Sequence, residues 1–165
     1  MKFDDDIRTL AECLLEAARQ RGLYIATAES CTGGLVAAAL TSVAGSSDVV
    51  DRGFVTYTND AKQQMLGVNV KSLELYGAVS EAVAKEMSYG ALANSMADIS
   101  VSVTGIAGPG GGSDDKPVGT VYFSVAQLGD IPVVERRDFT DMNRDEVRTQ
   151  ATIVALSLIL EAIAS

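Results

Sequence analysis

Hydrophobic residues recur along the chain with two different periods. In five stretches they return every three or four positions, which predicts helices, and the short apolar or alternating runs between them predict strands. Gly22 follows the first periodic stretch, and Asn59 and Ser80 begin two others, as is typical of helix ends. The predicted helices span residues 4–20, 35–42, 59–66, 80–96 and 143–164, and the predicted strands span residues 23–28, 52–58, 98–104, 118–127 and 133–139.

The order of these elements predicts the fold class. Strands alternate with helices until the last two strands, which a Gly129-Asp130 turn joins as a hairpin. This order is typical of a three-layer α/β/α sandwich around a mixed sheet. Asn143 and Glu146 have the spacing of a capping box at the start of the last helix. With 165 residues, 47% of them hydrophobic, and no internal repeat or linker, we expect residues 1–165 to form a single domain.

Charge and cysteine content narrow the possible partners. The chain carries 22 acidic and 13 basic residues, a formal net charge of −9, which argues against binding to nucleic acid or to an anionic membrane. The acidic start at Asp4 is unlike a signal peptide, and no apolar run approaches the roughly 18 residues that span a bilayer. Two cysteines make no disulfide framework. We therefore expect a cytoplasmic protein with a small-molecule partner, which local cations can hold even if it is anionic.

The chain contains no histidine. Its absence excludes Ser-His-Asp and Cys-His catalysis and metal sites built on imidazole. Any acid–base chemistry must then use Lys, Tyr, Cys, Asp or Glu. Asp114, Asp115 and the acidic residues 4–6 fit solvated loop and helix-start positions better than magnesium ligands. We predict neither a metal nor a cofactor.

Ser30 is the first candidate for chemistry. It lies in a turn, residues 29–34, that joins a predicted strand to a predicted helix and contains two glycines. Such a turn exposes a hydroxyl and leaves the first helical N–H groups free, which can supply a nucleophile and an oxyanion hole. A simple helix cap is the alternative. The Cys31 thiol should point away from the hydroxyl, and Cys13 lies on the apolar stripe of the first helix, where we expect it in the core.

Lys62 is the second candidate. It falls in the first turn of the helix that Asn59 begins, where the helix dipole disfavours a cation and should lower the pKa of the lysine. A lysine with a lowered pKa suits a general base or a proton relay. Without histidine, a Ser–Lys arrangement, or a Ser–Tyr–Lys arrangement with Tyr57, is a natural way to activate a serine. An exposed lysine on a short helix is the alternative.

A glycine-rich loop from Gly105 to Pro117 is the third candidate. Its N–H groups could surround a phosphate, or the loop could be a flexible connector, since it matches neither usual phosphate-binding pattern. Ser113 and Lys116 have S-x-x-K spacing, but Pro117 keeps Lys116 out of helical geometry, so we reject this motif. Because ligands sit beyond the carboxyl ends of strands, we expect this loop and the Ser30 turn at the same edge of the sheet.

Six sequence blocks lie in order across nearly the whole chain. They are Thr27-Ala-Glu-Ser-Cys-Thr-Gly-Gly34, Gly53-Phe-Val-Thr-Tyr-Thr-Asn-Asp-Ala-Lys62, Gly77-Ala-Val-Ser-Glu81, Gly105-Ile-Ala-Gly-Pro-Gly-Gly-Gly112, Lys116-Pro-Val-Gly-Thr-Val121 and Asn143-Arg-Asp-Glu-Val-Arg148. Together they resemble the CinA C-terminal domain family, known as nicotinamide-nucleotide amidase or nicotinamide mononucleotide deamidase. The resemblance implies a three-layer α/β/α sandwich of the anticodon-binding-like group. Longer relatives carry a preceding domain linked to pyrophosphatase chemistry, and nothing of that activity is carried over.

The resemblance also implies a reaction, in which the carboxamide of nicotinamide mononucleotide is hydrolysed to nicotinate mononucleotide and ammonia. It implies Ser30 as the nucleophile and Tyr57 and Lys62 as the activating pair. The amides of the turn that begins at Cys31 are then expected to hold the oxyanion. The residues expected to bind or surround the substrate are Cys31, Thr32, Gly33, Gly34, Thr104, Gly105, Ala107, Gly108, Arg144 and Arg148, with the two arginines as anion-binding candidates.

A non-catalytic nucleotide-binding module, acting as a sensor or docking domain, is the competing hypothesis. The same loops and cations would bind a mononucleotide without breaking a bond. Lys62 separates the two hypotheses, because binding tolerates arginine at that position whereas proton transfer does not.

The last predicted helix is apolar on nearly all sides. A sheet can cover one apolar stripe, but the second stripe must also be covered. We therefore predict a homodimer or a higher homo-oligomer with this helix in the interface. Coverage of the second stripe by the helix of residues 4–20 is the alternative. The first stripe comprises Val147, Ala151, Val154, Ala155, Leu158 and Ala162, and the second comprises Ile153, Leu156, Leu160 and Ile163.

Overall fold

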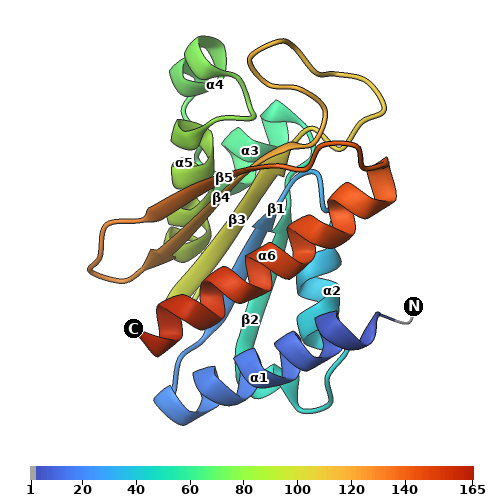
Figure 1. Ribbon diagram of the computed structural model, residues 1–165. Helices are drawn as coiled ribbons and strands as arrows, with labels where there is room; N and C mark the ends of the chain where they lie inside the picture. The colour runs from blue at the N-terminus through green and yellow to red at the C-terminus, as the bar shows by residue number, and fades with distance from the viewer. Residues whose placement is uncertain (1–2) are drawn as a thin grey trace.

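Five strands form one mixed sheet (Figure 1). They are β1 (Ile25–Glu29), β2 (Val50–Val55), β3 (Ile99–Gly105), β4 (Thr120–Gln127) and β5 (Val133–Asp138), in the order β2-β1-β3-β4-β5. The structure is a computed structural model that describes residues 3–165. β1 runs parallel to β2 and β3, whereas β3–β4 and β4–β5 are antiparallel. The predicted mixed sheet with a late hairpin is confirmed.

Helices cover both faces of the sheet, which confirms the predicted three-layer α/β/α sandwich. One face carries α1 (Asp5–Arg21), α2 (Leu35–Thr41) and α6 (Arg144–Ala164), and the other carries α3 (Asn59–Leu66), α4 (Val70–Tyr76) and α5 (Glu81–Ala93). Each face has its own apolar core. A short 3-10 helix, Ser46–Asp48, precedes β2, and the predicted capping box of Asn143 and Glu146 begins α6.

The structure differs from the sequence prediction at two points. The helix α4 was not predicted, because only Leu73 is buried in it while Leu75 and Tyr76 are exposed, so no apolar period marks it. Cys13 is exposed rather than in the core. The buried stripe of α1 includes Ala11 and Leu14, and position 13 falls just outside it.

The apolar helix α6 is largely covered within the chain itself. α1 lies alongside it on the same face of the sheet (Figure 1), and Leu156 and Ile163 are completely or almost completely buried. The alternative, in which the helix of residues 4–20 covers the second apolar stripe of α6, therefore fits the structure. The homo-oligomer stays a prediction, but an uncovered stripe on α6 no longer supports it. By length and composition α6 could also cross a bilayer, a property that it shares with core helices of soluble proteins. Polar Thr152 and Ser157 interrupt its apolar run.

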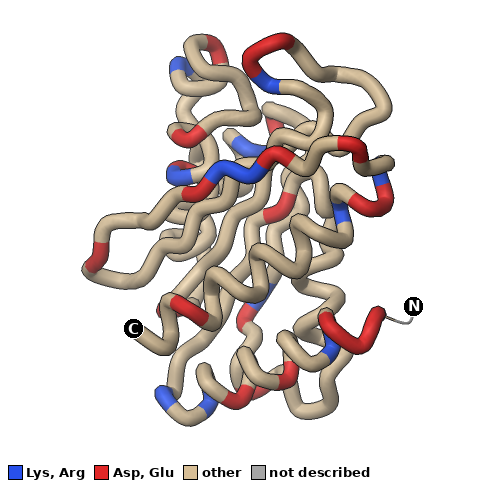
Figure 2. The backbone as a smooth tube through the Cα atoms, viewed as in Figure 1, with Lys and Arg blue, Asp and Glu red and all other residues tan. Residues whose placement is uncertain are grey.

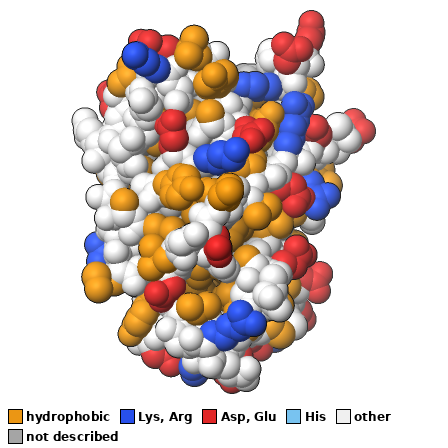
Figure 3. Space-filling view, turned by 90° about the vertical axis from the view of Figure 1, so that its left-hand side faces the viewer, with side chains coloured by type: hydrophobic (Ala, Val, Ile, Leu, Met, Phe, Trp, Pro, Cys, Tyr) orange, Lys and Arg blue, Asp and Glu red, His pale blue; other side chains and the backbone are white. Residues whose placement is uncertain are grey.

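Exposed apolar side chains gather instead near the β4–β5 hairpin. Figure 3 shows hydrophobic side chains on the side of the molecule that carries this hairpin. Leu128, Ile131 and Val133 are each more than half exposed there.

The end of β1 determines where the site forms. Side chains alternate between the two faces of a strand. The Glu29 carboxylate accordingly reaches the start of α2, while Ser30 reaches Lys62 of α3 on the other face. The parallel strands β1 and β3 end at the same edge, where the Ser30 N–H donates to the Val103 carbonyl at 2.9 Å. The Ser30 turn and the glycine-rich loop therefore share one sheet edge, as predicted.

Candidate active site

Ser30 and Lys62 meet at the carboxyl end of β1. The Lys62 Nζ lies 3.0 Å from the Ser30 Oγ, and it donates to the Thr56 carbonyl oxygen at 2.8 Å. Thr58, rather than Asn59, caps α3 by accepting from the Ala61 N–H, which fixes the turn that carries Lys62. Two residues that are 32 positions apart in the sequence thus have the geometry of a nucleophile and its base.

Lys62 is almost completely buried, with 1% of its surface exposed. Burial lowers the pKa of Lys62 from 10.5 to about 8. The pKa of Lys62 is lowered, as the sequence predicted, but the main cause is desolvation rather than the helix dipole. The alternative of an exposed lysine is wrong. With this pKa, about a tenth of the lysines are neutral at pH 7, which makes Lys62 a competent proton acceptor.

The turn after Ser30 has fewer free amides than expected. The Gly33 N–H donates to the Ser30 carbonyl at 3.1 Å, and the Gly34 N–H donates to the Glu29 carboxylate at 3.0 Å. The expectation that the Gly33 and Gly34 amides are free to hold an oxyanion is therefore wrong. Within residues 3–165, the N–H groups of Cys31 and Thr32 donate to no oxygen and face only the Cys31 thiol, a weak acceptor, so they are the donors of this turn that a substrate oxygen can take over.

Cys31 lies beside the nucleophile but is poorly suited to replace it. Its side chain is buried, and burial raises the pKa of the Cys31 thiol to about 12. The thiolate, which is the nucleophilic form, is then scarce at neutral pH. This leaves the Ser30 hydroxyl as the better placed nucleophile.

Arg144 lies at the mouth of the site. Its guanidinium donates to the Gly108 carbonyl at 2.7 Å and to the Tyr57 hydroxyl at 3.0 Å. Tyr57 is 62% exposed, and in the described part of the chain its hydroxyl contacts Arg144 and neither Ser30 nor Lys62. Arg144 therefore joins the glycine-rich loop to Tyr57 across the site.

Arg148 lies one turn further along α6 and contacts the nucleophile turn itself. It donates to the Cys31 carbonyl at 3.2 Å and to the Thr32 carbonyl at 3.1 Å. The structure thus places both arginines near the site, but only Arg144 is among the residues that surround the cavity. The anion-binding role of Arg148 stays a prediction.

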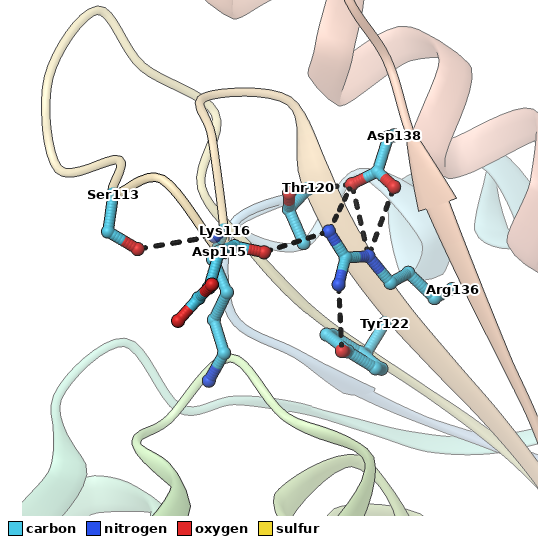
Figure 4. A network of polar contacts seen from close by, with 7 residues as sticks. All are labelled: Ser113, Asp115, Lys116, Thr120, Tyr122, Arg136 and Asp138. Carbon is cyan, nitrogen blue, oxygen red and sulfur yellow. Dashed lines mark hydrogen bonds and ion pairs between the residues drawn. The ribbon is translucent and has the colours of Figure 1, made fainter.

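Polar contacts hold the far end of the glycine-rich loop (Figure 4). Arg136 of β5 donates to the Asp115 carbonyl at 3.1 Å, and the Lys116 Nζ donates to the Tyr76 carbonyl at 2.7 Å. The Ser113 hydroxyl accepts from the Lys116 N–H and does not contact the Lys116 Nζ, which agrees with the rejection of the S-x-x-K motif. The loop is therefore anchored to β5 and α4 and does not behave as a free connector. The network in the figure comprises Ser113, Asp115, Lys116, Thr120, Tyr122, Arg136 and Asp138.

A cavity of about 210 Å³ opens above Ser30 and Lys62. Whole-ligand pockets are typically about 300–1,000 Å³, so this cavity has room for only a part of a ligand of that size. Its walls include three residues without a predicted role, Asn59, Ala78 and Val79. Thr104 also lines it and donates from Oγ1 to the Ala78 carbonyl at 2.8 Å. The lining residues are Ser30, Cys31, Tyr57, Asn59, Lys62, Ala78, Val79, Thr104, Gly105, Ala107 and Arg144.

Other hollows in the molecule lack this chemistry. One of about 510 Å³ lies between the β4–β5 hairpin and the end of α6, and its lining includes Ser165 but no lysine to activate it. Within residues 3–165, no group of three or more Cys, Asp or Glu side chains is arranged to hold a metal ion. Lys and Arg are interspersed with Asp and Glu along the backbone, as in β5, where Glu135, Arg136, Arg137 and Asp138 follow one another (Figure 2).

Comparisons with known proteins identify the family of this chain. Residues 7–163 match the model of the CinA C-terminal domain family. Nicotinamide-nucleotide amidohydrolase PncC of Escherichia coli strain K12 is 49% identical over 156 residues, which cover 94% of each chain. A putative competence-damage inducible protein of Caldicellulosiruptor saccharolyticus is 46% identical over 96% of this chain but only 38% of its own length. The crystal structure of competence/damage inducible protein CihA from Agrobacterium tumefaciens has a TM-score of 0.96 at 48% identity, covering 100% of this chain and 99% of that one.

Proposed function

Because this chain belongs to the CinA C-terminal domain family, and a relative of matching extent is named a nicotinamide-nucleotide amidohydrolase, we propose that it is an amidohydrolase that converts nicotinamide mononucleotide to nicotinate mononucleotide and ammonia. The observation that carries this proposal is the buried contact of 3.0 Å between the Lys62 Nζ and the Ser30 Oγ. Such a pair activates a serine in a chain that contains no histidine.

The first half of the reaction forms an acyl-enzyme. Neutral Lys62 accepts the proton of the Ser30 hydroxyl as Oγ attacks the carboxamide carbon. The N–H groups of Cys31 and Thr32 stabilise the oxyanion of the tetrahedral intermediate. The intermediate collapses as the C–N bond breaks and the Lys62 ammonium returns the proton to the leaving nitrogen. Ammonia departs, and an ester joins Ser30 to the nicotinate group.

The second half releases the product. Water takes the place of ammonia and gives a proton to Lys62 while its oxygen attacks the ester carbon. The same amides stabilise the second oxyanion, and the Ser30 oxygen leaves with the proton held on Lys62. Ser30 and neutral Lys62 are thereby restored, and the nicotinic acid group loses its proton to the solvent to give the carboxylate product. In this scheme Lys62 is the direct base, because the Tyr57 hydroxyl contacts Arg144 instead.

Tyr57 and Arg144 suit the part of the nucleotide that lies outside the cavity. The nicotinamide ring of the mononucleotide is a cation, and an exposed tyrosine ring at the rim can attract it through its π face. Arg144 can meet the phosphate, which an arginine fork binds well, beside the backbone of the glycine-rich loop.

We expect Arg144→Ala to weaken substrate binding more than chemistry. Loss of a charge-assisted contact of about 1.5–3 kcal/mol should raise KM roughly 10- to 100-fold and leave kcat within about threefold. Tyr57→Phe keeps the ring and should leave turnover within the same range. Steady-state ammonia release at varied substrate concentration measures both effects. If Tyr57→Phe instead slowed turnover by about 100-fold or more, Tyr57 would be a proton relay.

The rate should rise with pH through the pKa of Lys62. Only the neutral lysine accepts the serine proton, so kcat/KM should increase tenfold per pH unit below about 8 and level off above it. Initial rates in overlapping buffers from about pH 6 to about pH 9.5, on protein whose fold is checked by circular dichroism at each pH, measure the profile. A rate that is constant or that falls over this range would contradict Lys62 as the base.

The proposal also covers the cellular setting and the assembly of the protein. A nucleotide substrate of this kind fits a cytoplasmic enzyme with a small-molecule partner. The chain's acidic net charge of −9 supports no nucleic-acid or membrane partner. A homodimer or higher homo-oligomer stays part of the proposal, and light scattering at micromolar concentration measures it. A monodisperse species near 17.2 kDa would exclude it.

A further inference from the structure

Glu29, the residue before the nucleophile, makes contacts that fix the turn after Ser30. From its contacts we propose that Glu29 and Arg148 form a two-sided clamp, which positions the turn after Ser30 so that the N–H groups of Cys31 and Thr32 can stabilise the oxyanion. The inference rests on the proposed function and deepens it. Both residues act through the backbone and are positioning residues.

The Glu29 carboxylate is completely buried, and every contact that it makes is to a donor. Its Oε2 accepts from the N–H groups of Gly34 and Val36, each at 3.0 Å. Its Oε1 accepts from the Ala37 N–H at 2.8 Å and from the Thr27 hydroxyl at 3.2 Å. The carboxylate therefore fixes the end of the turn by occupying the positive end of α2, so that these amides are unavailable to a substrate.

The backbone of the same residue fixes the start of the turn. The Glu29 carbonyl accepts from the Thr56 N–H at 2.8 Å, and the next N–H, that of Ser30, donates to the Val103 carbonyl at 2.9 Å. The end of β1, just before the nucleophile, is thus hydrogen-bonded on one side to the residue that follows β2 and on the other side to β3. Only Cys31, Thr32 and Gly33 lie between these two fixed points.

Arg148 holds this middle segment from its carbonyl side. In a trans peptide the C=O and N–H point in opposite directions, and the peptide after Cys31 is trans. Because Arg148 binds the Cys31 carbonyl, the Thr32 N–H of the same peptide points away from the arginine. The Thr32 carbonyl is bound as well, and the N–H of its peptide, that of Gly33, donates to Ser30. A carboxylate that binds N–H groups and a guanidinium that binds C=O groups thus fix the turn in one orientation.

Glu29→Gln tests the clamp most directly. It keeps the size of the side chain, but its NH₂ group must face the Ala37 N–H in one placement of the amide and the N–H groups of Gly34 and Val36 in the other. We expect kcat to fall about 100-fold, the loss typical of one oxyanion donor, with KM within about threefold. The second readout is the rate at which phenylmethanesulfonyl fluoride sulfonylates Ser30, which should fall in parallel and does not require nicotinamide mononucleotide.

Glu86→Gln is the matched control. Glu86 is also a carboxylate that holds a helix start, accepting from the Asn69 N–H at 2.8 Å and from the Ser72 hydroxyl, but it does so at α4 and does not line the cavity. The Glu86→Gln substitution should lower the thermal unfolding midpoint and leave kcat and the sulfonylation rate of Ser30 unchanged. A folded Glu29→Gln variant with kcat within threefold of the wild type, or an equal loss in Glu86→Gln, would overturn the clamp.

Two further variants keep the test decisive if Glu29→Gln does not fold. Thr27→Val removes one donor to Glu29 at constant shape, and we expect kcat to fall about threefold to tenfold with KM unchanged. Arg148→Lys keeps the charge but loses the fork that spans two carbonyls, so kcat should fall while KM is unchanged. Unchanged kcat in Thr27→Val, or a raised KM with unchanged kcat in Arg148→Lys, would overturn the proposal. If wild-type protein releases no ammonia, the proposed function fails, whereas the relative sulfonylation rates still decide on the clamp.

Discussion

Ser30→Ala is expected to lower kcat for ammonia release from nicotinamide mononucleotide by about 10⁴-fold or more, because the hydroxyls of Tyr57 and Thr104, which also line the cavity, do not contact Lys62. The residue is small and buried, and its removal leaves the backbone contacts of the turn in place. KM should change little. The measurement is ammonia release by the purified variant, with its thermal unfolding midpoint recorded beside that of the wild type.

The control for this variant is Ser113→Ala. Ser113 has the S-x-x-K spacing with Lys116, but its hydroxyl only accepts from a backbone N–H at 3.2 Å in an exposed turn. The Ser113→Ala variant should keep wild-type turnover. Near wild-type turnover by a folded Ser30→Ala variant would refute Ser30 as the nucleophile.

Replacement of Lys62 is expected to have the second largest effect. Lys62→Met fills the same buried space without a titratable group, and kcat should fall about 10³-fold because general-base catalysis is lost. Lys62→Arg should lose activity to a similar extent, since arginine stays protonated. Binding of nicotinamide mononucleotide to Lys62→Met, measured by calorimetry, should remain within about tenfold of the wild type.

A matched lysine lies on α5. Lys85 is partly exposed and pairs with Glu81 at 2.7 Å, so Lys85→Arg should leave turnover unchanged. The non-catalytic alternative predicts that Lys62→Arg binds the nucleotide normally and that neither it nor the wild type releases ammonia. Full turnover by Lys62→Arg would contradict proton transfer through Lys62.

The sequence predicted most elements of the fold because their patterns are local. The capping box at Asn143 and Glu146 and the Gly67 stop after α3 depend on neighbouring residues, and the structure has both. By contrast, α4 escaped prediction because it buries only Leu73 and packs as a short surface helix. A seven-residue helix with one buried side chain leaves little periodic signal.

The candidate site was only partly predictable, for a different reason. Ser30 and Lys62 could each be selected from turn and helix position, but their contact depends on how β1, β2 and α3 are placed in space. The partner of the Tyr57 hydroxyl is 87 positions away in the sequence. Glu29 was overlooked because an acidic residue at a strand end is usually solvated, and only tertiary structure shows that it is buried among four donors.

Ammonia release from nicotinamide mononucleotide by the purified wild-type chain, measured in EDTA together with the nucleotide product, tests the central claim most directly. The account predicts one ammonia for each nicotinate mononucleotide formed, with turnover unaffected by the chelator. Tight binding of nicotinamide mononucleotide without release of ammonia would contradict it and would favour the nucleotide-binding module.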